Sequence, residues 1–134
     1  MKVTVEAVVM APVEVVWAAW TTPEDICAWN AASDDWHTVR SVVDLRVGGR
    51  FNSRMEAKDG SFGFDFEGVY TRVKEHVVLE AMLGDRALLV EFEAVQGGTR
   101  VRETFDAEDQ NPVEMQRQGW QAILDNFKRH VEAS

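Results

Sequence analysis

One carboxylate in the segment TRVRETFD, residues 99–106, falls on a face that the sequence predicts to be buried. In a strand with this alternation, Val101, Glu103 and Phe105 share one face, and the arginines share the other. A carboxyl group among apolar neighbours is destabilising unless it is paired or protonated, so we expect its pKa to be raised. A general acid or base near neutral pH needs such a pKa, which makes Glu103 the candidate catalytic residue. Two alternatives stay open: Glu103 pairs with an arginine, or a bulge shifts the strand face by one residue.

A second group of candidates lies near the C-terminus, where apolar residues recur at helical spacing. Trp120 follows Gly119, whose missing side chain lets another backbone or a ligand approach. A buried indole N–H usually needs a hydrogen-bond partner, so Trp120 is a candidate donor to a ligand. Ile123 and Phe127 lie on the same apolar stripe. For all three residues, the alternative is that they only fill the core.

The stretch WNAASDDWHTVR, residues 29–40, mixes aromatic and polar side chains. We expect four of them to frame an entrance to a cavity: Trp29, Asp34, Trp36 and His37. His37 stands close to two aspartates in this stretch. A single histidine without HxH or HExxH spacing does not predict a metal site, so we expect no metal. We also expect no cofactor, because GxSxG is absent and Gly48-Gly49 precedes Arg-Phe rather than a helix start.

The composition predicts one globular domain over residues 1–134, with 46% hydrophobic and 28% charged residues. A formal net charge of -9 repels phosphate backbones and anionic lipid, so nucleic acid and membranes are not expected partners. Cys27 is the only cysteine, which excludes an intramolecular disulfide. The N-terminus interrupts its apolar residues with Thr4 and Glu6, unlike a signal peptide, and we expect a cytoplasmic protein.

The predicted elements follow from periodicity and turn residues. Residues 2–10 alternate as a half-buried strand, and Pro12 and Pro23 open two short helices. Six alternating runs then occupy about 36–106, the first continuing to residue 47, with turns at Gly48-Gly49, Asp59-Gly60, Gly84-Asp85 and Gly97-Gly98.

A long helix over about 112–132 closes the chain. Asn111 and Pro112 predict its start, and Glu114 is placed to complete a capping box. The order of the elements is one strand, two helices, six strands and one helix. This order predicts an α+β fold with a seven-stranded curved antiparallel sheet around the last helix. Twist curves such a sheet, with further bending expected at Gly48-Gly49 and Gly68, so we expect a cavity between helix and sheet.

Five segments together resemble the bacterial proteins grouped with the C-terminal domain of the activator of Hsp90 ATPase. They are APVEVVWAAWTTPEDICAW, DLRVGGRF, EGVYTRV, GGTRVRETF and MQRQGWQAILDNFKRHVE. This family belongs to the START-like, or helix-grip, superfamily of lipid-transfer domains, birch-allergen-type proteins and aromatic polyketide cyclases. The resemblance covers nearly the whole chain and implies a deep cavity under the last helix, usually for an amphiphilic or aromatic molecule.

From the residues and this resemblance we predict that the chain binds, carries or transforms a small hydrophobic or aromatic molecule, with catalysis left open. An enclosed site of that kind is lined by apolar groups and a few polar ones. The predicted ligand-binding residues are Trp29, Trp36, Phe51, Met55, Phe64, Phe66, Val101, Glu103, Trp120, Ile123 and Phe127.

Two other functions stay open. The family name implies stimulation of a chaperone ATPase, but the chaperone activator has a separate N-terminal domain. This chain begins directly with its first strand, which argues against a chaperone interaction and leaves a co-chaperone-like protein-interaction module as the alternative function. Five tryptophans are many for 134 residues and interfaces favour tryptophan, so a homodimer is the other alternative.

Overall fold

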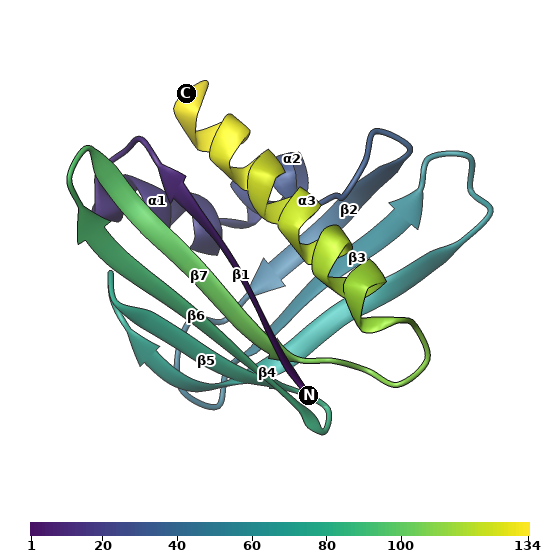
Figure 1. The fold of residues 1–134 in the computed structure, drawn as a ribbon. Helices are drawn as coiled ribbons and strands as arrows, with labels where there is room; N and C mark the ends of the chain where they lie inside the picture. Colours follow the sequence, from purple (N-terminus) through teal and green to yellow (C-terminus); the bar gives the residue numbers. More distant parts are fainter.

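A seven-stranded antiparallel sheet curves around one long helix in the computed structural model, which describes residues 1–134 (Figure 1). The strand order across the sheet is β1-β7-β6-β5-β4-β3-β2. The predicted α+β class and element order are confirmed. The elements are β1 (Lys2–Val9), α1 (Val13–Thr21), α2 (Pro23–Trp29), β2 (Trp36–Val43), β3 (Arg50–Ala57), β4 (Gly63–Lys74), β5 (Val78–Leu83), β6 (Arg86–Val95), β7 (Gly98–Asp106) and α3 (Val113–Glu132).

Strand β7 shows most directly how the sequence pattern sets the inner face of the sheet. Its residues alternate between buried and half-buried along its whole length, and it pairs with β1 and β6 without a register shift. Val101, Glu103 and Phe105 therefore all point inward, with at most 5% of each residue exposed. The predicted face is correct, and no bulge displaces Glu103.

Helix α3 is fixed along the edge strand β1. An edge strand presents unpaired carbonyl groups, which are open to pairing with another chain unless they are covered. Three side chains of α3 donate to successive outward carbonyls of β1: Arg117 to Thr4 O at 3.2 Å, Gln121 to Glu6 O at 3.2 Å and Lys128 to Val8 O at 2.8 Å. The helix thus covers this edge of the sheet while its apolar face turns toward the interior.

Aromatic side chains join the three helices at the end of the molecule where α3 finishes. The ring centroids of Trp20, Trp29 and Phe127 lie 4.8 to 4.9 Å apart, and Trp29 donates its indole N–H to Ala19 O at 3.0 Å. Phe127 is fully buried, which stabilises the fold by about 1.5–3 kcal/mol relative to an exposed side chain. These contacts anchor the C-terminal half of α3 over α1 and α2.

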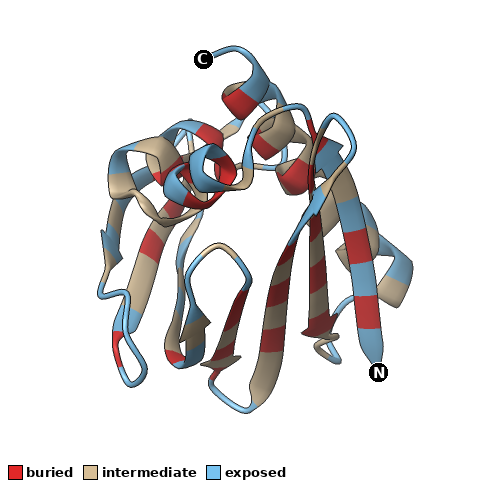
Figure 2. Cartoon of the chain, turned by 90° about the vertical axis from the view of Figure 1, so that its left-hand side faces the viewer, coloured by how far each residue is buried: buried red, intermediate tan, exposed pale blue.

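The other half of the sheet is less well covered. Strands β5, β6 and β7 alternate with buried residues, whereas β4 has one buried residue among twelve. Figure 2 shows the same asymmetry as regular red bands on one side of the curved sheet and mostly tan and blue on the other. Register shifts near Val39 and Thr71 increase the local twist in this second half. The interior of the sheet is therefore open beside β2, β3 and β4, which α3 does not cover (Figure 2).

One predicted cap and one predicted boundary are wrong. Helix α3 spans Val113–Glu132, within one residue of the predicted range, but Pro112 is its cap and Asn111 makes no side-chain cap bond. Instead the Glu108 carboxylate accepts from the backbone N–H and the amide of Asn111, and Gln116 folds back onto the backbone of Glu108. A carboxylate upstream of the helix organises this turn, so no capping box is needed.

Strand β2 ends at Val43 rather than at residue 47, because the chain turns back on itself. Gly49 donates to Arg46 O, and Gly49 and Gly48 each pair with the backbone of Tyr70. A Cβ atom on Gly49 would lie 2.0 Å from Asp44 O, so this position requires glycine. None of the helices has the length and apolar character needed to span a membrane.

The homodimer prediction assumed that exposed tryptophans form an interface, but no tryptophan of this chain is exposed. Trp17 and Trp29 are buried, and the other three tryptophans are half-buried. The homodimer itself stays a prediction, and its original argument from exposed tryptophans no longer supports it.

Two glycine-to-alanine substitutions should change stability in opposite directions. We expect Gly49→Ala to lower the free energy of unfolding by about 2 kcal/mol or more, since its Cβ meets backbone. Gly119→Ala should raise it by about 0.5–1 kcal/mol, because alanine is the better helix former and nothing lies within 4 Å of its Cβ. Urea denaturation of both variants measures this, and equal effects would contradict the structure.

Candidate ligand-binding site

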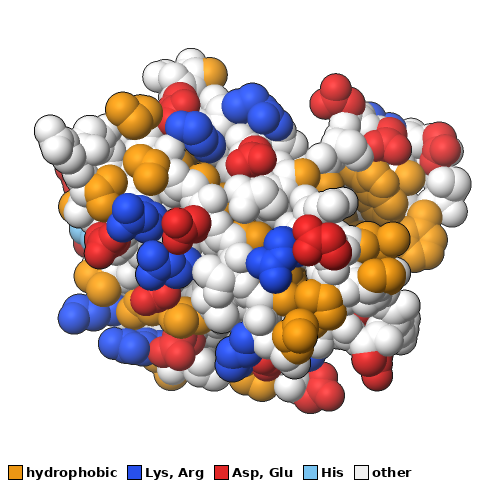
Figure 3. All heavy atoms as spheres, viewed as in Figure 1, with side chains coloured by type: hydrophobic (Ala, Val, Ile, Leu, Met, Phe, Trp, Pro, Cys, Tyr) orange, Lys and Arg blue, Asp and Glu red, His pale blue; other side chains and the backbone are white.

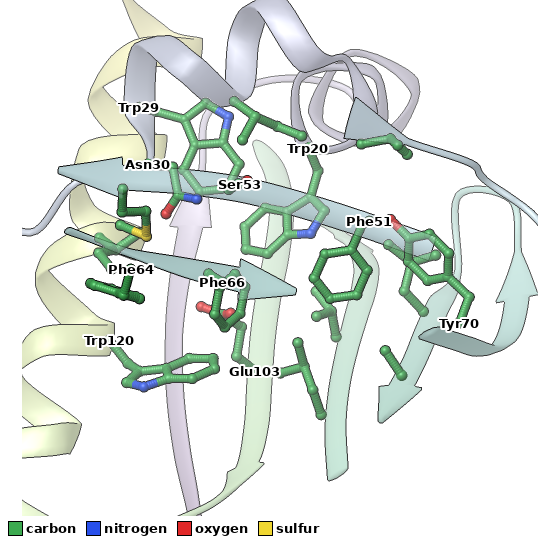
Figure 4. A pocket seen from close by; sticks show the side chains of 18 residues that line it. Trp20, Trp29, Asn30, Phe51, Ser53, Phe64, Phe66, Tyr70, Glu103 and Trp120 are labelled. Atoms are coloured by element: carbon green, nitrogen blue, oxygen red, sulfur yellow. The ribbon is translucent and has the colours of Figure 1, made fainter. Parts of the chain in front are cut away.

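A cavity of about 160 Å³ lies between α3 and the less covered half of the sheet (Figure 4). Fifteen of its eighteen lining residues are hydrophobic, and the polar ones are Asn30, Ser53 and Glu103. An apolar enclosure with a few polar groups is the usual form of a small-molecule site. The lining residues are Trp20, Ile26, Trp29, Asn30, Val43, Phe51, Ser53, Met55, Phe64, Phe66, Tyr70, Leu79, Ala81, Leu88, Val90, Glu103, Trp120 and Ile123.

Aromatic rings form a continuous wall across β3, β4 and α3. Phe51 lies 5.1 Å from Tyr70 and 5.8 Å from Phe66, measured between ring centroids. Phe66 meets the edge of Trp120 at 5.9 Å, and Trp120 stacks on Phe105 at 3.9 Å. Each ring is therefore held by another ring, which fixes the wall before any guest enters.

Gly68 makes room for the Phe51 ring. These two residues are paired across β3 and β4, and a Cβ on Gly68 would lie 2.9 Å from two atoms of that ring and 2.7 Å from Met82 O. The ring consequently lies directly on the backbone of β4. The predicted bend at Gly68 falls slightly later, at the register shift between Tyr70 and Arg72.

Glu103 has no protein partner for its carboxyl group. The residue is 5% exposed, and its side chain makes neither a hydrogen bond nor an ion pair. Both neighbouring arginines point to the outer face, where Arg100 pairs with Glu93 and Arg102 with Glu6. The alternative of an arginine pairing is therefore wrong. Burial raises the pKa of Glu103 from 4.5 to about 8, so the carboxyl is mostly protonated at neutral pH.

Other polar side chains of the lining also lack protein partners. Asn30 and Tyr70 are each less than 9% exposed, and neither the Asn30 amide nor the Tyr70 hydroxyl makes a hydrogen bond within the protein. Burial raises the pKa of Tyr70 to about 12. The indole N–H of Trp120 is also unpaired, in contrast to that of Trp29. None of these groups is sealed in the core, and all of these residues line the cavity.

The cavity opens beside Phe64, which lines it and is still 41% exposed. Trp36 packs against Phe64 and Phe62, with ring centroids 5.9 and 6.0 Å away, and so extends the aromatic wall outward. Figure 3 shows apolar side chains gathered below a notch on the right-hand side of the molecule. A guest would reach the cavity through this opening.

Eight of the eleven predicted ligand-binding residues line the cavity, and three do not. Val101 and Phe127 are fully buried in the core, while Trp36 lies at the rim. No group of three potential ligands surrounds a metal position, and His37 and its neighbouring aspartates lie outside the cavity. His130, in the last turn of α3, contacts Asp25 at 2.9 Å and joins α3 to α2.

Two lining residues that we did not predict, Ser53 and Tyr70, follow the same strand alternation as residues that we did predict. Ser53 lies between Phe51 and Met55 on one strand face, and Tyr70 continues the face of Phe64 and Phe66. The same period-two rule therefore finds them. Asn30 follows the last residue of α2, where no periodicity indicates which way a side chain points.

Comparisons with known proteins give one family and several solved structures. The family model described as "Activator of Hsp90 ATPase homolog 1-like protein" matches residues 10–132. The AHSA1-like protein of Aeromonas hydrophila, solved in solution by NMR, is 54% identical with a TM-score of 0.93, covering 99% of this chain and 93% of that one. Chr148 of Cytophaga hutchinsonii is 44% identical with a TM-score of 0.85, covering 98% and 92%.

More distant structures share only the fold. Protein NE0264 of Nitrosomonas europaea is 19% identical, with a TM-score of 0.84 and coverage of 99% of this chain and 95% of that one. No curated protein matches the sequence. The matched family thus spans the elements that build the cavity, from α1 through α3.

The raised pKa of Glu103 should make the free energy of unfolding depend on pH between about pH 4.5 and pH 8. Between the unfolded pKa of 4.5 and the folded pKa of about 8, the unfolded chain has released a proton that the folded chain retains. The protonated carboxyl therefore contributes its full stability below pH 4.5, and this contribution decreases by about 1.4 kcal/mol per pH unit up to pH 8.

Glu103→Gln removes this titration, so the free energy of unfolding of the variant minus that of the native protein should increase steadily from pH 5 to pH 8. Urea denaturation at several pH values measures the difference. Glu14→Gln, at an exposed carboxylate, is the matched control and should show a constant difference. A constant difference for Glu103→Gln as well would contradict the assigned burial.

Proposed function

The chain belongs to the Activator of Hsp90 ATPase homolog 1-like family, and we propose that it binds a small hydrophobic or aromatic molecule in the cavity under α3. The observation that carries this proposal is the group of buried polar side chains that face the cavity without protein partners. An unpaired buried polar group costs about 1–3 kcal/mol, and a guest that pairs with it recovers part of that free energy.

The size of the cavity sets the scale of the guest. An apolar cavity of about 150 Å³ holds a benzene molecule, and the cavity under α3 has about 160 Å³. The enclosed part therefore accommodates one aromatic ring with a short substituent, and a longer substituent can extend past Phe64 toward the opening.

Glu103 defines what chemistry the cavity would support if the guest is transformed. It is the lining group whose pKa of about 8 allows exchange of a proton near neutral pH. No cysteine, histidine or lysine lines the cavity. The reaction that this lining supports most directly is a proton transfer to or from the guest, with Asn30 and Tyr70 as hydrogen-bonding groups.

The description of the family names activation of the Hsp90 ATPase. We do not propose this activity for the chain, because the features described above all concern the interior rather than a protein-binding surface. The steady-state ATPase rate of an Hsp90 chaperone, measured with and without the protein, tests that alternative directly, and an increased rate would support it.

Indole is a suitable first probe because it is aromatic, uncharged and of the right size. We expect it to raise the midpoint of thermal unfolding by several degrees when present at about 100 times its Kd, which corresponds to about 2.7 kcal/mol of stabilisation. Differential scanning calorimetry measures this shift, and its concentration dependence gives the affinity.

Filling the cavity should abolish the shift. Ala81→Leu adds three carbon atoms to the inner face of β5, and we expect the variant to fold and to lose binding at least tenfold. Ala18→Leu adds the same atoms to the exposed face of α1 and should bind indole like the native protein. Equal shifts in all three proteins would place the indole outside this cavity and contradict the proposal.

A further inference from the structure

The charges around the cavity restrict which guests it accepts. Among the eighteen lining residues there is no lysine, arginine or histidine, and Glu103 is the one carboxylic acid. The whole chain has a formal net charge of -9. A carboxylate, sulfate or phosphate group on a guest would therefore enter the cavity without a cation to pair with, next to a potential negative charge.

The position of Glu103 places its carboxyl beside the aromatic wall. Phe105 follows two residues later on the same strand face, and its ring stacks on Trp120 at 3.9 Å. Figure 4 shows the Glu103 oxygens pointing into the space enclosed by the labelled side chains, with Phe66 and Trp120 nearby. The carboxyl is thus next to ring faces that attract positive charge through their quadrupoles.

Acidic side chains also surround the opening. Figure 3 shows more acidic than basic side chains around the notch on the right-hand side. The loop before β2 and the turn between β3 and β4 meet here, because Lys58 donates its backbone N–H to Asp35 O at 2.8 Å. These two segments contain three acidic residues, Asp34, Asp35 and Asp59, against one basic residue, Lys58. A negative rim raises the local concentration of cations and lowers that of anions.

From these three observations, and resting on the proposed function, we propose that the guest is a small aromatic molecule with a protonated amine, whose ammonium group pairs with Glu103. The ammonium supplies the N–H donors and the positive charge that the unpartnered carboxyl lacks. A charge-assisted hydrogen bond of this kind is about twice as strong as a neutral one. The ring of the guest would lie against the wall formed by Phe51, Phe66 and Trp120.

Binding of a cation should release a proton, because Glu103 is mostly protonated in the empty cavity at neutral pH. Tyr70 is the other ionisable group of the lining, and its pKa of about 12 keeps it protonated. The side chains facing Glu103 from β1, β6 and α3 are uncharged: Val3, Val5, Leu88, Val90, Trp120 and Ile123. No other group is therefore expected to take up the released proton.

Three probes of similar size separate the classes of guest: benzylamine as the cation, benzyl alcohol as the neutral molecule and benzoate as the anion. Isothermal titration calorimetry at pH 7 should give benzylamine at least a tenfold lower Kd than benzyl alcohol, with benzoate the weakest. Titrations in two buffers with different ionisation enthalpies should show release of nearly one proton per benzylamine and none for benzyl alcohol.

Two variants assign the preference to Glu103. Glu103→Gln should bind benzylamine no more tightly than benzyl alcohol and should release no proton. Glu91→Gln removes the same charge from the adjacent strand β6, but on the outer face, and should keep the native preference. If Glu103→Gln fails to fold, the order of the three probes on the native protein still tests the proposal.

The outcomes separate this inference from the proposed function. Binding of benzyl alcohol as tightly as benzylamine would overturn the amine assignment and leave a neutral aromatic guest. Preferred binding of benzoate would also overturn it. Failure of all three probes and of indole to bind at millimolar concentration would overturn the proposed function itself.

Discussion

The attachment of α3 to the edge strand β1 is the constraint on which the rest of the structure depends. Arg117, Gln121 and Lys128 donate to carbonyl groups of that strand, and the aromatic contacts of Phe127 fix the other end of the helix. A helix held on one edge of a curved seven-stranded sheet cannot also cover the opposite edge. The uncovered half, formed by β3 and β4 with their neighbours, becomes the wall of a cavity rather than part of a solid core.

This arrangement also explains why a carboxylic acid is kept in the interior. Glu103 lies on a strand whose register is fixed on both sides, so its side chain cannot turn to the outer face of the sheet. Its neighbours Val101 and Phe105 are fully packed, whereas Glu103 itself faces the cavity. Replacing it by an apolar residue would remove a destabilising group from the fold. A buried acid with a strongly raised pKa in a cavity is typical of functional sites, and stability alone does not account for it.

Much of the fold follows from local patterns in the sequence. The alternation of β7 fixed its inner face, and the turn residues Asp59-Gly60, Gly84-Asp85 and Gly97-Gly98 located three hairpins. The wrong end of β2 and the wrong helix cap have long-range or unusual causes: the 44–49 turn pairs with Tyr70, and Glu108 replaces a helix cap. Periodicity describes neighbours along one element and contains no information about such contacts.

The candidate site was predictable in part for the same reason. Strand faces identified Phe51, Met55, Phe64, Phe66 and Glu103, all of which line the cavity. Helical spacing placed Trp120 and Phe127 on one stripe, but only tertiary packing shows that Trp120 faces the cavity and Phe127 the core. The orientation of Asn30 and the position of the opening depend on how α2 and β2 meet, which no local pattern encodes.

The space under α3 is empty of protein and lined mostly by apolar side chains. Crystals of the protein held under xenon pressure test this directly, because xenon enters dry apolar cavities. The structure predicts a xenon atom inside the wall formed by Phe51, Phe66 and Leu88. Density in that space from protein side chains, with no xenon bound, would contradict it.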